Sequence, residues 1–208
     1  MSTITNIIRR NRLISTLTAT ATVLALVPAG ASAATTWFGS SLNHDPANAG
    51  STCADDGVMT SSLCTHVGSF YPGTSGRAQS PATGTITTIK VLPQGPMTMR
   101  VKVVQVRNLS SDERSGQAKT VAHSRLIQVQ GPSQTDLDNG TYSVESFPVH
   151  LKVKKGQEIA IDTSSNTAEY CSDGTPGQLL FGPVLGNQFR TSNGVDDCLM
   201  LVQAVVQH

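Results

Sequence analysis

The sequence has few charged residues and few aromatic residues, and neither basic nor acidic residues form a block. Asp, Glu, Lys and Arg make up 14% of the 208 residues, and Phe, Trp and Tyr make up 4%. A surface for nucleic acid or for an anionic membrane needs clustered basic residues. We therefore expect no nucleic-acid partner and no attachment to anionic lipid.

No motif in the sequence indicates a catalytic nucleophile. The Gly-x-Ser-x-Gly pattern of serine hydrolases is absent. His150 lies on the polar side of an expected strand, and His208 is the last residue. Neither histidine has a sequence spacing to a Ser or a Cys that indicates a catalytic pair. We therefore expect no catalytic residues, and a secreted hydrolase ranks third among the functions considered.

The long apolar run stands near the N-terminus, in a pattern typical of a secretory signal peptide. Three arginines within residues 9–12 precede an apolar stretch from Leu13 to Val27 and the small-x-small cleavage signal Ala31–Ala33. The stretch is too short and too rich in Thr to span a bilayer. Removal of residues 1–33 leaves a secreted, extracellular chain, 34–208, with no expected membrane span. Without those arginines, 12 basic residues face 14 acidic ones, a formal net charge of −2.

All four cysteines, Cys53, Cys64, Cys171 and Cys198, lie in the expected mature chain. An even number of cysteines in an exported chain indicates two disulfides. Three pairings are possible, of which we favour the local one, Cys53–Cys64 with Cys171–Cys198. In the chain-entropy model, loops of these lengths stabilise a fold by roughly 3 kcal/mol each. Zinc sites use closer pairs such as Cys-x-x-Cys, so we do not expect thiolate–metal bonds.

Alternation of apolar and polar residues predicts an all-β protein. Along Phe147–Val153 every second residue is apolar, which is the period of a half-buried strand. Pro148 cannot donate a ladder hydrogen bond, so this strand is expected at a sheet edge or to begin near Pro148. Cys198–Val206 is apolar at both parities, which is typical of a strand covered on both faces. The other expected strands are Thr36–Leu42, Thr85–Leu92, Met97–Val106, Arg125–Gln130, Tyr142–Val144, Glu158–Asp162 and Leu179–Leu185.

About nine short strands separated by Gly, Pro, Asn and Ser predict a single antiparallel β-sandwich, jelly-roll-like, over residues 34–208. The apolar positions of Met97–Val106 change parity at Val103-Val104, which predicts a β-bulge there. Asn139-Gly140 predicts a type I′ hairpin turn. Residues 43–80 are rich in Gly, Ser, Thr and Asp, and we expect them to be irregular and to carry the first cysteine pair.

Five segments carry a resemblance to a known group of proteins: Phe38–Leu42, Cys53 with Cys64-Thr65, Ser80–Ile86, Met97–Val106 and Phe147–Asp162. In this order they resemble a group of uncharacterised secreted actinobacterial proteins. The last segment is similar to the strand–Gly-Asp–strand hairpin of many jelly-roll modules, with Gln157 where that pattern has Asp. The resemblance implies a β-sandwich and export, and it implies no reaction, because a fold alone does not define a function.

Acidic pairs next to cysteines are the candidate metal ligands. Asp55-Asp56 and Asp196-Asp197 each lie near a cysteine that holds the backbone. Calcium takes carboxylate oxygens, so a structural calcium ion is the one cofactor considered. Asp136–Gly140 begins like a calcium-binding loop, but it is one residue short and lacks the later Glu.

Trp37, Tyr71, Tyr142 and Tyr170 are the candidate ligand-binding residues, because sugar-binding sandwiches stack exposed rings on pyranose faces. The leading hypothesis is a non-catalytic binding module for an extracellular glycan or cell-wall polymer. The alternative is a secreted interaction or structural envelope protein whose partner is a cell-surface protein, paired along the edge of Phe147–Val153. An exposed aromatic row would favour the sugar, and a flat apolar patch would favour the protein.

Overall fold

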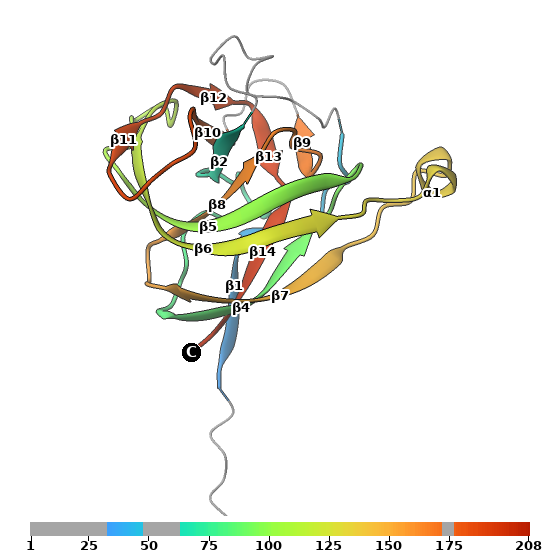
Figure 1. Ribbon diagram of the computed structural model, residues 1–208, viewed down its shortest axis with the longest axis horizontal. Helices are drawn as coiled ribbons and strands as arrows, with labels where there is room; N and C mark the ends of the chain where they lie inside the picture. Colours follow the sequence, from blue (N-terminus) through green and yellow to red (C-terminus); the bar gives the residue numbers. More distant parts are fainter. Residues whose placement is uncertain (1–32, 48–62, 172–176) are drawn as a thin grey trace, which may run out of the picture. The chain divides into compact units, whose positions relative to one another are not determined.

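The computed structural model describes residues 33–47, 63–171 and 177–208. The chain divides into residues 1–32 and Ala33–His208, and the described residues all belong to the second unit. Apart from Ala33, the expected signal peptide lies outside the described residues. The strand ladders of the second unit are antiparallel, and one five-residue helix accompanies them (Figure 1). The expected all-β class is therefore confirmed.

The strands form two large sheets and one small one. In order of hydrogen bonding, the first sheet contains β3 (Gly76–Arg77), β1 (Thr35–Ser40), β14 (Val202–Gln207), β4 (Gly84–Val91) and β7 (Glu145–Val153). The second contains β11 (Arg190–Thr191), β6 (Gln117–Val129), β5 (Met97–Arg107), β8 (Glu158–Thr163), β2 (Cys64–Gly68), β10 (Gln178–Phe181) and β12 (Gly194–Asp196). The small sheet pairs β13 (Cys198–Met200) with β9 (Glu169–Cys171).

The main core lies between the two large sheets. Phe38 and Ile86 from the first sheet and Met99, Val101 and Ile159 from the second are fully buried in one apolar cluster. Burial of this apolar surface is the main favourable term in folding a sandwich. The two inner faces therefore hold the sheets together.

A second apolar cluster covers the outer face of the second sheet. Val104, Ala160 and Leu179 pack there against Leu185, which belongs to the segment between β10 and β11. That segment, residues 182–189, folds back over the strands. The middle of the second sheet is therefore buried on both faces, as the complete burial of β8 shows.

The expected edge strand is confirmed, because β7 is the last strand of the first sheet. Pro148 lies in β7, where one side of the strand has no neighbour among the described residues. The strand expected at Cys198–Val206 is divided at Leu201. Its first part is β13 in the small sheet, and its second part is β14 in the middle of the first sheet.

The register between β5 and β6 shifts between Val103 and Val104, as the change in parity predicts. The additional residue is in β6, because Val103 pairs with Ala122 and Val104 pairs with Thr120. Val104 does not turn into the main core. Val104 belongs to the outer cluster. The apolar residues of β5 therefore change from one face to the other because the second sheet is covered on both faces.

The hairpin turn predicted at Asn139-Gly140 is wrong, because α1 (Gln134–Asp138) forms there, at the tip of the long connection between β6 and β7 (Figure 1). The backbone N–H of Asp136 donates to Ser133 Oγ at 3.2 Å, and the carboxylate of Asp136 accepts from the backbone N–H of Ser133 at 3.1 Å. This reciprocal pair is a capping box. Asn139 has a φ of −92° rather than the positive φ of a type I′ turn.

Two other expectations also need correction. Residues 142–144 form no strand, and the segment 43–80 is not wholly irregular, because it contains β2 and β3. Cys171 and Cys198 form the expected disulfide across directly paired residues of β9 and β13. Cys53 lies outside the described residues, so the pair Cys53–Cys64 stays a prediction. Across the described ranges, no helix is long and apolar enough to cross a membrane.

Candidate functional site

A cleft of about 610 Å³ lies between the edges of the two large sheets. Residues 123–127 of β6 form one wall and residues 148–151 of β7 form the other, and we name it the edge cleft. β11 pairs with β6 only at Gln117 and Ala118. Within the described part of the chain, no strand covers the rest of this side of β6 or the outer side of β7. The cleft is therefore bordered by two free strand edges.

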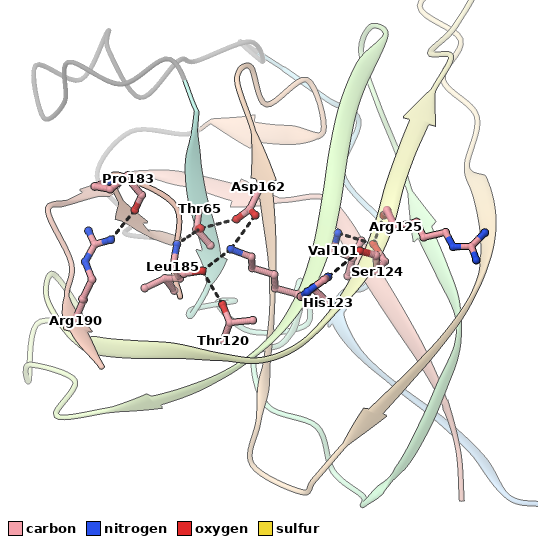
Figure 2. Close-up of polar contacts among 11 residues, drawn as sticks. Thr65, Val101, Thr120, His123, Ser124, Arg125, Asp162, Pro183, Leu185 and Arg190 are labelled. Atoms are coloured by element: carbon pink, nitrogen blue, oxygen red, sulfur yellow. Dashed lines mark hydrogen bonds and ion pairs between the residues drawn. The ribbon is translucent and has the colours of Figure 1, made fainter. Parts of the chain in front are cut away.

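An irregularity in β6 shapes the cleft wall. The register with β5 shifts between Arg100 and Lys102, which leaves an additional residue in β6 near Ser124. The Ser124 hydroxyl accepts the backbone N–H of Val101 at 3.0 Å and donates to the carbonyl of Arg125, as Figure 2 shows. This side chain thus replaces a ladder hydrogen bond within the bulge. It is committed to the backbone and is not placed as a nucleophile.

The lining of the edge cleft combines apolar and basic side chains. Ile127 and Leu151 are buried in its floor, and Leu126 has 61% of its surface exposed. Arg125 and His150 are exposed at the rim. The cleft can therefore bind an extended chain that carries both apolar and acidic groups.

A second pocket, of about 360 Å³, lies on the outer face of the second sheet, and we name it the Lys102 pocket. It is lined by Arg100, Lys102, Thr120, Val121, His123, Asp162 and residues 184–187. His123 also lines the edge cleft, so the two hollows are neighbours. Figure 2 places His123 between Asp162 on one side and Ser124 and Arg125 on the other.

Lys102 is a buried cation with a defined set of partners. Its side chain is 4% exposed, and its ammonium contacts the Asp162 carboxylate at 2.8 Å. It also donates to the carbonyl oxygen of Leu185 at 2.7 Å. Thr65 donates its hydroxyl hydrogen to the other carboxylate oxygen of Asp162 and accepts the backbone N–H of Leu185 at 2.9 Å (Figure 2). The network therefore holds residues 182–189 onto the sheet.

Burial lowers the pKa of the Lys102 ammonium, because desolvation disfavours its charged form. The hydrogen bond and the charge of Asp162 raise this pKa, and the positive charge of Arg100 lowers it further. Removing either partner of a buried ion pair strongly destabilises a protein, because the other charge is then left buried without a counter-charge. Two cations and one carboxylate thus stand together in the Lys102 pocket.

A third polar group lies at the end of the core, around His66, Glu169 and Asp196. All three side chains are buried, and each offers a possible metal-ligand atom within 4.8 Å of the others. Burial lowers the pKa of His66 to about 4, so the imidazole is neutral at neutral pH. Gln178 contacts His66 Nδ1 at 3.2 Å and donates to Glu169 at 3.1 Å. One imidazole with carboxylates suits a transition metal better than calcium.

The four candidate aromatic residues lie in different surroundings. Tyr71 is buried and donates to the carbonyl of Met200 at 3.2 Å. The ring of Tyr170 stacks on His44 with the centroids 4.7 Å apart, and the Arg77 guanidinium lies 5.4 Å from the Trp37 ring. Tyr142 packs against the main core. The ring contacts of the described residues join none of these four to another.

The structure describes two of the four candidate metal ligands, Asp196 and Asp197, and these have different neighbours. Asp196 lies in the His66 group, whereas Asp197 pairs at 3.5 Å with the exposed guanidinium of Arg114. Asp55 and Asp56 lie outside the described residues. A structural calcium ion stays a prediction.

Sequence reasoning named one wall of the edge cleft, within Phe147–Val153, as a pairing edge, and it missed the β6 wall and the Lys102 pocket. Lys102 and Asp162 alternate with apolar neighbours, as solvent-facing residues of a half-buried strand do. They are buried because Leu185 reaches them from a distant part of the chain. The sequence does hold one signal of this, since Val104 and Ala160 are apolar at the same parity and indicate a covered outer face.

Comparisons of the chain with protein-family models, with curated proteins and with solved structures found no match. The fold and the two hollows therefore define the class of protein: an antiparallel β-protein of two packed sheets, with a cleft at the sheet edges.

Proposed function

We propose that the protein is a secreted, non-catalytic binding module that holds an extended, acidic segment of a partner protein in the edge cleft. The position of the cleft between two free strand edges carries this proposal. An extended peptide adds to an open edge through main-chain hydrogen bonds, while alternate side chains enter neighbouring pockets. At about 3.3 Å per residue, residues 148–151 offer an edge of roughly 13 Å, which is enough for about four residues.

The side chains of the cleft support an acidic occupant. Arg125 brings a fixed positive charge to the cleft. No Asp or Glu is among the described residues that line the cleft. Leu126 and Val149 add apolar contact area. A strand with alternating acidic and apolar residues matches this lining.

A glycan ligand has less support. Sugar recognition by stacking needs exposed rings, and the four candidate rings are buried, in contact with another side chain or packed on the core. Secretion rests on the N-terminal pattern of residues 1–33. The jelly-roll likeness and the resemblance to secreted actinobacterial proteins rest on the five segments named in the sequence analysis. Secretion, the jelly-roll likeness and this resemblance are parts of the proposal.

The test uses two polyanions that differ in class. Fluorescence anisotropy would measure binding of the mature, oxidised protein to a labelled random glutamate–leucine copolymer and to labelled polygalacturonate of similar length. We expect saturable binding of the copolymer and little binding of polygalacturonate. Arg125→Gln and Val149→Asp should each weaken copolymer binding about tenfold, because each removes or opposes a contact of the cleft. The control is Lys155→Gln, which removes an exposed cation outside the cleft.

Three other outcomes would contradict the proposal. Equal or tighter binding of polygalacturonate would replace the protein partner with a glycan. Failure of both polymers to bind, or equal binding by Arg125→Gln and Lys155→Gln, would show that the edge cleft is not the binding site.

A further inference from the structure

The Lys102 pocket contains more positive than negative charge. Arg100 and Lys102 both line it, and Asp162 is the one carboxylate among the described lining residues. Arg100 and Asp162 are directly opposite each other in the β5–β8 register. The arginine is therefore held next to the ion pair of Lys102 and Asp162 by the sheet itself.

Both carboxylate oxygens of Asp162 are engaged by side chains other than the arginine. One of its oxygens accepts the hydroxyl hydrogen of Thr65, and the other pairs with the ammonium of Lys102. Arg100 forms no salt bridge with any described residue, and its Nε is buried without a hydrogen-bond partner. A buried guanidinium N–H without a partner costs free energy, because it has lost its contact with water.

A guanidinium N–H needs an oxygen acceptor, and an oxyanion carries several of them. A guanidinium presents its N–H groups in a planar fork that matches carboxylate, sulfate and phosphate oxygens. The amide of the exposed Asn187 can add side-chain N–H donors, whereas Nδ1 of His123 already donates to the carbonyl of Ser124 at 3.1 Å. The pocket volume of about 360 Å³ leaves room for the anionic group and part of the molecule that carries it.

We propose that the Lys102 pocket is an anion-binding site in which Arg100, with Asn187, holds one small oxyanion group. The ion pair of Asp162 and Lys102 shapes the site without contacting the anion, and Arg100 supplies the net positive charge. This inference rests on the pocket alone and is independent of what the edge cleft binds.

The test is a titration of the mature protein with phosphate, sulfate and acetate, each at constant ionic strength with chloride as the balancing anion. Two-dimensional ¹H–¹⁵N spectra would follow the backbone amides of Val121, His123 and Gly186, which line the pocket. We expect saturable shifts centred on these amides. The three salts separate a tetrahedral dianion from a planar carboxylate as the preferred group.

Variants decide whether Arg100 is responsible. Arg100→Gln should weaken the preferred anion at least tenfold, because it removes a charge-assisted hydrogen bond. The control, Lys119→Gln, removes a nearby cation that lies 4.7 Å from the ring of Phe189 and does not line the pocket. Should Arg100→Gln not fold, Asn187→Asp places a negative charge at the exposed border and should weaken binding several-fold. Linear, non-saturating shifts, or equal affinities for Arg100→Gln and Lys119→Gln, would overturn the proposal.

Discussion

Gly39 lies where β1 approaches the backbone of β14 more closely than any side chain allows. Its φ is 92°, and a Cβ atom added to it would stand 2.3 Å from the carbonyl oxygen of Val202. Glycine alone tolerates this combination of left-handed backbone and close contact. The central pairing of the first sheet therefore depends on this residue.

We predict that Gly39→Ala lowers the free energy of unfolding by more than about 2 kcal/mol, because it adds a clash with backbone to an unfavourable φ. The matched control is Gly73→Ala. Gly73 also has a positive φ, 57°, but a Cβ atom added to it would meet nothing within 4 Å. The Gly73→Ala variant should lose only about 1 kcal/mol of unfolding free energy, because the unfavourable φ is its one cost. Urea unfolding followed by tryptophan fluorescence measures both, and equal losses would contradict the packing argument.

At the residue scale, the alternation of polarity predicts which residues belong to strands but not which polar residues are buried. Tyr71 follows Phe70 in a Gly- and Ser-rich segment, where an exposed ring is the ordinary expectation. It is buried because its ring occupies the space left by Gly68 and Gly76, where a Cβ would come within 2.4 Å and 2.6 Å of its atoms. Such a contact depends on how strands are placed beside one another, which no local pattern records.

At the scale of elements, the segment between β10 and β11 is held down by one polar network. The carbonyl of Leu185 accepts from Lys102 at 2.7 Å and from Thr120 at 3.0 Å, and its N–H donates to Thr65. Leu185 is also part of the outer apolar cluster. The segment is therefore fixed at one residue by polar and apolar contacts together.

We predict that Lys102→Met destabilises the protein by about 3–5 kcal/mol, because it leaves the buried Asp162 carboxylate without its counter-charge. The double variant Lys102→Met, Asp162→Leu should recover most of this loss, since an apolar pair can replace a buried ion pair. Urea unfolding gives the free energies. Hydrogen exchange at the Leu185 amide should become faster in the single variant. A double variant as unstable as the single one would show that the loss comes from packing and not from the unpaired charge.

Some secondary-structure elements can be predicted from a local sequence pattern, and others cannot. β7 and β8 are predicted well because half of each period-2 pattern faces the core or the outer cluster. α1 is missed because Asn139-Gly140 is typical of a turn, while the capping pair of Ser133 and Asp136 is the less familiar signal of a helix start. The edge cleft has only Pro148 as a sequence signal, because its other wall is β6, which comes to lie beside β7 only when both sheets are assembled.

At the scale of the whole molecule, the interior holds several titratable side chains, so the stability of the fold depends on pH. Glu158 is 2% exposed, and burial raises the pKa of its carboxyl from 4.5 to about 8 although Gln79 donates a hydrogen bond that lowers it. Burial also lowers the pKa of His66 from 6.5 to about 4. Both groups are therefore neutral in the folded protein near pH 6.

These two shifts act in opposite directions. Between pH 4.5 and 8 the unfolded chain releases the Glu158 proton that the folded chain retains, so stability falls as the pH rises. Between pH 6.5 and 4 the unfolded chain binds a proton at His66 that the folded chain does not bind, so stability falls as the pH decreases. The two contributions offset each other from about pH 4.5 to 6.5. Above that range, of these two groups only Glu158 contributes to the slope.

We predict that Glu158→Gln removes most of the loss of stability between about pH 6.5 and 8, because the amide stays neutral at every pH. One titrating group contributes at most about 1.4 kcal/mol per pH unit, so the wild-type protein should lose about 2 kcal/mol over this interval relative to the variant. Urea unfolding at about pH 5, 6.5 and 8 measures the difference. Asp138→Asn, at an exposed position at the end of α1, is the control and should follow the wild-type profile. Parallel profiles of Glu158→Gln and the wild type would mean that Glu158 is already ionised in the folded protein, and the buried carboxyl would then need a cationic partner at this end of β8.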